Sequence, residues 1–313
     1  MYIIDQNFIK KILEEWKIDF RIDENDHVTN EYAQKEIKKI VNDKIIPSMK
    51  LNINDYLGSK YNMEQQKALD TIFSMTVILY RLCESIYSYF MKSGKEIEKP
   101  DDELEVLSKL TANLLQNYKG SMNSYLADDF LTVIQKNRIL YECYVVFMFV
   151  KKYPELARDF IDYVDIIKYQ IVKNEWKNNI SGSETIKKIE SLKKNYFEQK
   201  GNNYGNYGWT NKVIPNDINR KFEYMVNDLK LDEKLGSVYK ISSDYVHSNP
   251  YSAFIQPDRK MSICFIRISI DILVNQTSHF VERICNNKTY NTLINLLINP
   301  FKDKCLEVID KHI

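Results

Sequence analysis

Apolar residues recur along most of the chain at the three- and four-residue spacing of an amphipathic helix. Only 8 glycines and 7 prolines interrupt this pattern in 313 residues, and no stretch is a convincing strand. We therefore predict an all-α fold, a multi-helix bundle with an N-terminal helical region (residues 1–118) and a helical core domain (residues 119–313). The pattern predicts helices over residues 8–20, 31–46, 63–91, 101–118, 121–152, 155–177, 183–200, 215–229, 232–245, 257–285 and 289–313.

Polar and helix-breaking residues set the expected ends of several helices. Asp101 and Asp102 are placed to cap the fourth predicted helix, and Gly120 is placed to close it. Pro154 is expected to break the long central helix that follows. Pro215 is expected to start a later helix, because proline is favoured in the first helical turn.

A run rich in Gly, Asn and Tyr, residues 201–210, interrupts the helical pattern. Loops of this length are uncommon in compact domains and are often functional or disordered. The aromatic residues Tyr204, Tyr207 and Trp209 can stack on a base or cover a pocket. The alternative role is structural, with the same rings pinning the loop against the body of the protein.

Acid–base pairs lie inside otherwise apolar helical segments. Arg138 and Glu142 are four residues apart, which brings two side chains together on one helix face. Because buried charges need partners, this pair either forms a preorganised polar site or only locks helix packing. In the first case the arginine holds a phosphate, and the glutamate orients it or acts as an acid–base group. The same alternatives apply to two further pairs, Arg267 with Asp271 and Arg81 with Glu84.

His247 lies in the polar stretch 242–250, near an expected helix C-terminus. An imidazole there can act as a general base, or it can cap the last carbonyls of the helix. Asp244 is three residues away, a spacing that allows metal chelation, but no Cys/His cluster or His-Glu-x-x-His motif accompanies it. We therefore expect no metal and no cofactor. Structural or solvated roles are expected for His27, His312, His279 with Glu282, and the lysines at 187, 188, 193 and 194.

The charge balance provides no global field for attracting nucleic acid or an anionic membrane. The chain has 44 basic and 43 acidic residues, for a net charge of +1. Five cysteines are widely spaced without a Cys-x-x-Cys pair, which favours a reducing compartment over a disulfide framework. No signal peptide is visible, and the longest uncharged apolar run, residues 143–150, is too short to cross a bilayer. We expect a cytoplasmic protein without a membrane partner.

Several short motifs, taken in order, resemble an uncharacterised bacterial all-α family. They are residues 138–142 with the apolar helix behind them, residues 153–158, Trp209, and residues 239–247. Members of that family carry Arg-x-x-x-Glu on one helix, a later Trp, and a Tyr-x-x-x-Ser-x-x-x-His-like stretch. The family is similar to HEPN domains, small helical bundles of toxin–antitoxin and phage-defence systems. The resemblance implies a HEPN-like core with additional N-terminal helices.

Many HEPN proteins are metal-independent ribonucleases, whereas others only bind nucleotides or partners. Their signature is Arg, then four to six residues, then His, and this chain departs from it because residues 241–243 before His247 are Ile, Ser and Ser. Arg21 and His27 have the spacing, but three acidic residues between them would repel a phosphate backbone. A nuclease site would therefore have to be assembled from separate helices.

The first functional hypothesis is a HEPN-like RNA-cleaving effector. His247 would take the proton from a ribose 2′-hydroxyl, Arg138 would stabilise the charge on the phosphate, and Glu142 would orient Arg138. Further contacts to the substrate are expected from Ser243, Asp244, Trp209, Tyr207 and Arg267.

Two other hypotheses stay open. One is a non-catalytic helical module that binds a nucleotide, a partner protein or another copy of itself, and a homo-oligomer is the expected assembly. The other is a metal-dependent helical enzyme that uses Glu142, Asp244 and His247.

Overall fold

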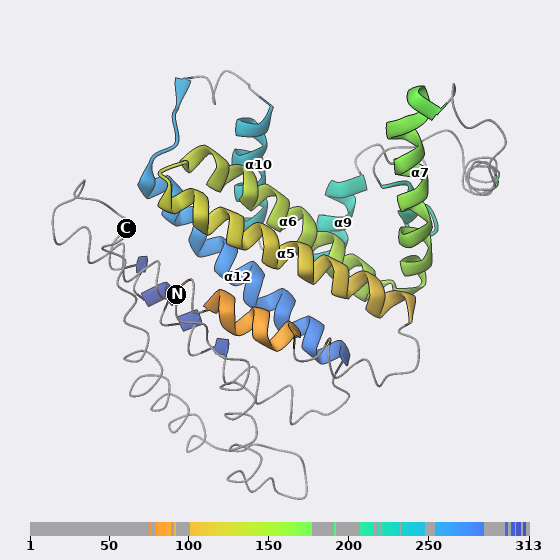
Figure 1. The fold of residues 1–313 in the computed structure, drawn as a ribbon, viewed down its shortest axis with the longest axis horizontal. Helices are drawn as coiled ribbons and strands as arrows, with labels where there is room; N and C mark the ends of the chain where they lie inside the picture. Colours follow the sequence, from red (N-terminus) through yellow and green to blue (C-terminus); the bar gives the residue numbers. More distant parts are fainter. Residues whose placement is uncertain are drawn as a thin grey trace, which may run out of the picture. The chain divides into compact units, whose positions relative to one another are not determined.

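The computed structural model describes an all-α protein, and no strand occurs among the described residues (Figure 1). The principal helices are α5 (Asp102–Leu126), α6 (Phe130–Lys152), α7 (Ala157–Trp176), α9 (Lys221–Leu229), α10 (Glu233–Val246) and α12 (Arg259–Ile284), with short 3-10 turns η4 (Pro154–Leu156) and η5 (Gly208–Thr210). The described residues are 76, 79–88, 91, 101–176, 191, 207–215, 218, 221–231, 233–247, 254–284, 298–299, 302–303, 305–307 and 309–310.

The predicted all-α bundle is confirmed by these elements. The predicted helices over 8–20 and 31–46 lie outside the described residues, so the proposed boundary at residue 118 stays a prediction. The described parts of the predicted helix over 63–91 are helical. No span able to cross a lipid bilayer occurs among the described helices.

The chain divides into two compact units. The first unit comprises residues 1–98, 111–144 and 233–313, and the second unit comprises residues 99–110 and 145–232. Both α5 and α6 therefore run without interruption from one unit into the other.

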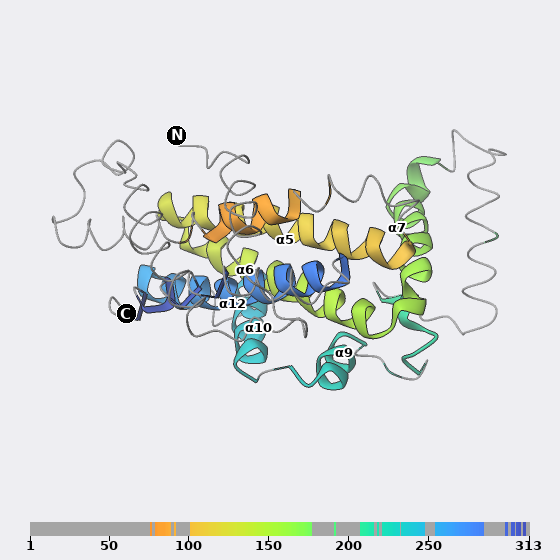
Figure 2. The same ribbon diagram turned by 90° about the horizontal axis from the view of Figure 1, so that it is seen from below.

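The core of the first unit forms where parts of α5 and α6 lie beside α12, an arrangement visible in both ribbon views (Figures 1 and 2). Large apolar side chains with less than 2% exposure fill this core, in line with the amphipathic spacing of the three helices. They include Leu114, Tyr118, Ile134, Tyr141, Ile266, Ile270, Leu273 and Phe280.

Two predictions about the region between α5 and α6 are wrong. Gly120 does not close a helix, because α5 continues through it to Leu126 and its open side faces the flexible side chain of Lys136. The predicted single helix over 121–152 is also wrong. Asp128 adopts a left-handed backbone conformation with φ 58°, and Asp129 then caps α6 by accepting a hydrogen bond from the Thr132 N–H at 3.1 Å.

Other helix ends agree with the sequence signals. Asp101 caps α5, since its Oδ1 accepts a hydrogen bond from the Leu104 N–H at 2.8 Å. The predicted break at Pro154 is confirmed: α6 ends at Lys152, and Pro154 begins the short turn η4. Pro215, in contrast, does not start a helix: it follows a turn that buries Ile214 completely, and α9 begins only at Lys221.

The second unit is organised around the short turn η5. Trp209 is 3% exposed, and its ring packs edge-on against Phe149 and Phe160, with ring centroids 6.2 and 5.0 Å away. Gly208 lies directly against Tyr163 of α7, whose ring is 2% exposed. This turn therefore acts as a packing element of the second unit.

We predict that Gly208→Ala destabilises the protein. A Cβ at this position would lie 2.5 Å from the Tyr163 hydroxyl oxygen, closer than any real contact allows. Because the buried ring has no room to move, we expect a loss of about 1–3 kcal/mol in the free energy of unfolding, measured by urea denaturation. Gly236→Ala is the matched control, because a Cβ there meets nothing within 4 Å in α10. A gain of about 0.5–1 kcal/mol is expected for the control, and equal behaviour of both variants would contradict the prediction.

Candidate functional site

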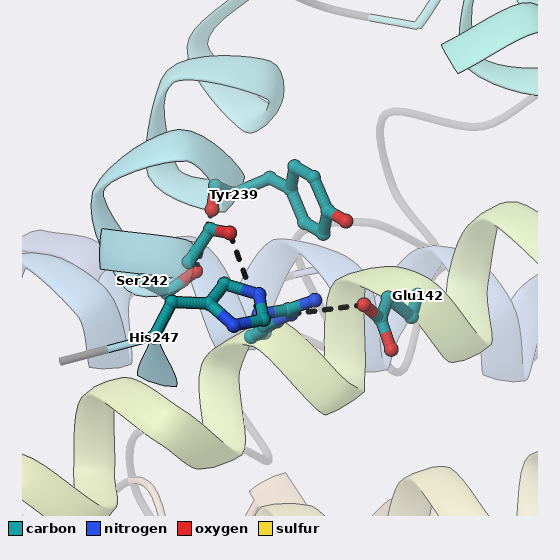
Figure 3. A network of polar contacts seen from close by, with 6 residues as sticks. Glu142, Tyr239, Ser242 and His247 are labelled. Carbon is teal, nitrogen blue, oxygen red and sulfur yellow. Dashed lines mark hydrogen bonds and ion pairs between the residues drawn. The ribbon is translucent and has the colours of Figure 1, made fainter. Parts of the chain in front are cut away.

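A cluster of polar side chains forms where the C-terminal end of α10 meets α6, within the first unit (Figure 3). The Arg138 Nε donates a hydrogen bond to Glu142 Oε1 at 2.9 Å. The Nη1 of the same guanidinium lies 3.0 Å from His247 Nε2 and 3.4 Å from Ser243 Oγ. These contacts join residues that are 105 and 109 positions apart in the chain.

Helical spacing explains why these side chains converge. Arg138 and Glu142 are four residues apart on α6, so they project from one face of that helix. Ser243 and His247 are also four residues apart, and the His247 N–H donates to the Ser243 carbonyl at 3.1 Å, which continues the helical turn. Two single-helix motifs therefore meet at one point.

Tyr239 extends the cluster by one further turn of α10. The guanidinium carbon of Arg138 lies 5.4 Å from the centroid of its ring, within range of a cation–π contact. The same ring packs against Tyr141 of α6, with centroids 5.5 Å apart. Tyr239 was not among the predicted site residues. Its sequence signal is the spacing, because Tyr239, Ser243 and His247 are four residues apart in turn and so lie on one face of α10.

The surroundings keep the cation charged and the phenols neutral. Burial opposes the charge on Arg138, but the hydrogen bond and the charge of Glu142 outweigh it and raise the pKa of Arg138. Burial, reinforced by the charge of Glu142, raises the pKa of Tyr239. Burial, with smaller effects from Tyr239 and Tyr144, raises the pKa of Tyr141 to about 12.

The cluster is half-buried and open to solvent at its imidazole. The side chains of Arg138 and Glu142 are 17% and 31% exposed, and His247 is an exposed residue. Because a guanidinium can only donate, the Nε2 of His247 must accept the bond from Arg138. A neutral His247 in this geometry therefore carries its proton on Nδ1.

Comparison with known families decides the affiliation of the chain. The family of unknown function DUF5677 matches residues 105–261, which is about half of the sequence. The chain belongs to this family. No curated protein and no solved structure matches the chain.

The resemblance to an uncharacterised all-α family is thus confirmed, while the similarity to HEPN domains stays a prediction. The matched part of the chain includes α6 and α10. It therefore also includes Arg138, Glu142, Ser243 and His247. The cluster is therefore part of the DUF5677 region of the chain.

Arg267 and Asp271 do not form the predicted ion pair. Arg267 Nε instead donates to Asp310 at 2.9 Å, and Asp271 pairs with Lys302 at 2.7 Å. Both partners, Asp310 and Lys302, come from the C-terminal segment. Each of the two α12 side chains therefore pairs with a charge from that segment and not with the other. The guanidinium of Arg267 is thereby committed to a contact outside the cluster.

The aromatic residues predicted to stack on a base lie elsewhere. Trp209 is in the core of the second unit, so its ring has no room for a ligand. Its role is the structural alternative, in which the ring holds the loop against the body of the protein. Tyr207, also in the second unit, packs against Phe222 with centroids 5.8 Å apart. Tyr204 lies outside the described residues. Asp244 is half-buried on α10, next to Ser243.

The remaining predicted groups divide into two sets. The Arg81–Glu84 pair is confirmed at 2.6 Å, and His279, for which a structural or solvated role was expected, forms a hydrogen bond with Glu282 at 2.8 Å. Across the described ranges, no three His, Cys, Asp or Glu side chains gather as a metal site requires. Arg21, His27, His312 and the lysines at 187, 188, 193 and 194 lie outside the described residues.

We predict that Arg138→Ala changes the tautomer of His247. Loss of the donor frees Nε2, so the proton shared between the two ring nitrogens redistributes toward Nε2. Long-range ¹H–¹⁵N spectra of protein labelled at its 4 histidines, recorded where the ring is neutral, measure this directly. Arg81→Ala, which removes an arginine from a different intrahelical pair, should leave the spectrum of His247 unchanged. Identical His247 spectra in wild type and Arg138→Ala would show that the contact does not form in solution.

Proposed function

We propose that this protein is a HEPN-like, metal-independent endoribonuclease whose active site is the Arg138–Glu142–Ser243–His247 cluster. The observation that supports it best is the 3.0 Å contact between Arg138 Nη1 and His247 Nε2, from helices far apart in sequence. A cation and an imidazole in contact at a solvent-exposed position suit the cleavage of a phosphodiester. Toxin–antitoxin or phage-defence systems, in the cytoplasm, are the proposed setting.

In the proposed reaction the substrate phosphate first displaces the imidazole from the guanidinium. A charge-assisted, bidentate arginine–phosphate contact is stronger than the bond from Arg138 to a neutral ring nitrogen. This exchange frees the Nε2 lone pair of His247 at the moment when the substrate arrives. The same step brings the phosphate to within reach of the Ser243 hydroxyl.

The chemical step is an internal transfer of the phosphoryl group. His247 Nε2 takes the proton from the ribose 2′-hydroxyl, and the 2′-oxygen forms a bond to phosphorus. The bond from phosphorus to the 5′-oxygen breaks, and the imidazolium returns its proton to that oxygen. The products are a 2′,3′-cyclic phosphate and a 5′-hydroxyl, with no net gain or loss of protons.

The other residues of the cluster act through Arg138. Glu142 holds the Nε of the guanidinium at 2.9 Å, which leaves the Nη edge directed toward the substrate. As negative charge builds on the phosphate oxygens, Arg138 stabilises it from a position already fixed before the reaction. Tyr239 covers one face of the guanidinium and reduces its hydration.

A second candidate function is a non-catalytic helical module that binds a nucleotide or a protein partner. It is favoured by one observation: the donors of Arg138 are engaged by Glu142, Ser243 and His247. A polar cluster that only fixes the packing of α10 on α6 would show the same bonds.

Cleavage assays with purified protein and single-stranded RNA separate the two functions. We expect cleavage that persists in EDTA, ends in 2′,3′-cyclic phosphate, and is absent for DNA, which lacks the 2′-hydroxyl. His247→Ala should reduce the rate by about 10²–10⁴-fold, and Arg138→Ala by about 10²–10³-fold.

His279→Ala is the matched control, because it removes a half-buried histidine whose ring bonds to Glu282 on the same helix, α12. It should cleave like the wild type. If wild-type protein binds RNA or a nucleotide without cleaving it, the non-catalytic function is the correct one. If His247→Ala cleaves at the wild-type rate, the proposed mechanism is wrong.

A further inference from the structure

A buried hydrogen bond joins α6 to α12 directly beside the Arg138 cluster. Asn137 is completely buried, and its Oδ1 accepts a hydrogen bond from Ser269 Oγ at 2.6 Å. Its Nδ2 donates to the Val133 carbonyl at 3.0 Å. Ser269 is 1% exposed and also lies 3.1 Å from the Phe265 carbonyl. Both polar side chains are therefore satisfied within the core of the first unit.

This polar contact fixes how α6 and α12 pack on each other. The neighbouring positions one turn away, Ile134, Ile266 and Leu273, are completely buried apolar residues that tolerate small shifts in register. The amide and the hydroxyl do not tolerate them, because any slide or rotation that separates them leaves two unsatisfied polar groups in an apolar interior. Single buried polar residues select helix register in coiled coils for the same reason.

The direction of Arg138 follows from the position of Asn137. Adjacent side chains on an α-helix point about 100° apart. With Asn137 held toward α12, Arg138 projects around α6 toward α10, where His247 and Ser243 lie. A rotation of α6 by roughly 20° would move an atom about 6 Å from the helix axis by about 2 Å. That displacement is enough to break the contact between Arg138 and His247.

We propose that Asn137 is a positioning residue, which acts with Ser269 to set the rotation of α6 so that the guanidinium of Arg138 meets His247. Neither Asn137 nor Ser269 touches a substrate in this role. The inference rests on the proposed function for its catalytic meaning, but the geometry it describes is testable without any activity.

The decisive variant is the double replacement Asn137→Leu with Ser269→Ala, which removes both polar partners together. Because no polar group is left unpaired, the protein should keep its helix content and unfold cooperatively. The ¹⁵N spectrum of His247, assigned through His247→Ala, should move toward that of Arg138→Ala. If the protein cleaves RNA, kcat should fall at least tenfold in the double variant, with a smaller change in KM.

Ser262→Ala is the matched control. Ser262 lies seven residues before Ser269 on α12, is completely buried, and its Oγ makes no hydrogen bond within the described part of the chain. Removing this hydroxyl changes the same helix face without touching Asn137, so the His247 spectrum should stay as in wild type.

A His247 spectrum identical to wild type in the folded double variant would overturn the proposal. Should the double variant not fold, Ser269→Ala alone supplies the test, with a smaller shift of the His247 spectrum in the same direction expected and no shift refuting it. A wild-type protein that cleaves no RNA would refute the proposed function but would leave these spectral results valid.

Discussion

A guanidinium that is mostly withdrawn from water needs acceptors, and this requirement shapes the centre of the first unit. Arg138 is 17% exposed and meets it with a carboxylate on its own helix and with a hydroxyl and an imidazole from α10. Removing Glu142 would leave the mostly buried guanidinium without its carboxylate partner, which is unfavourable. The cluster therefore holds α10 against α6 whether or not it also carries out chemistry. Its catalytic use would add the release of His247 from Arg138 when a phosphate arrives.

Local sequence signals predicted the helices well because their causes are local. The caps at Asp101 and the break at Pro154 act within one turn, and they appear in the structure as expected. Gly120 failed as a stop signal because glycine also occurs within helices at a cost of about 1 kcal/mol, and here the break comes at Asp128 and Asp129 instead. No signal at residues 128 and 129 is strong enough to place that turn without the structure.

The candidate site could be predicted only in part, because the sequence does not show which charged side chains pair with each other. The Arg138–Glu142 pair follows from spacing alone, whereas its contact with His247, 109 residues away in the chain, does not follow from spacing. Arg267 and Asp271 have the same spacing, yet each binds a charge from the C-terminal segment. A four-residue step shows that two side chains can pair, whereas tertiary contacts determine which pairs form. Trp209 illustrates the same limit. The sequence pattern of an aromatic residue in a glycine-rich run is the same whether the ring is buried, as here, or exposed to solvent.

The continuity of α5 and α6 has a consequence for how this protein can be dissected. Each helix contributes one part to the first unit and the remainder to the second, so the unit boundaries at residues 110/111 and 144/145 fall inside helices. A truncation at residue 144 would end α6 in mid-helix and discard Val145 and Phe147, both completely buried. Fragments designed on the usual assumption of a domain joined by a flexible connector would therefore expose core surface and aggregate, and the full-length chain is the appropriate object for both biochemistry and genetics.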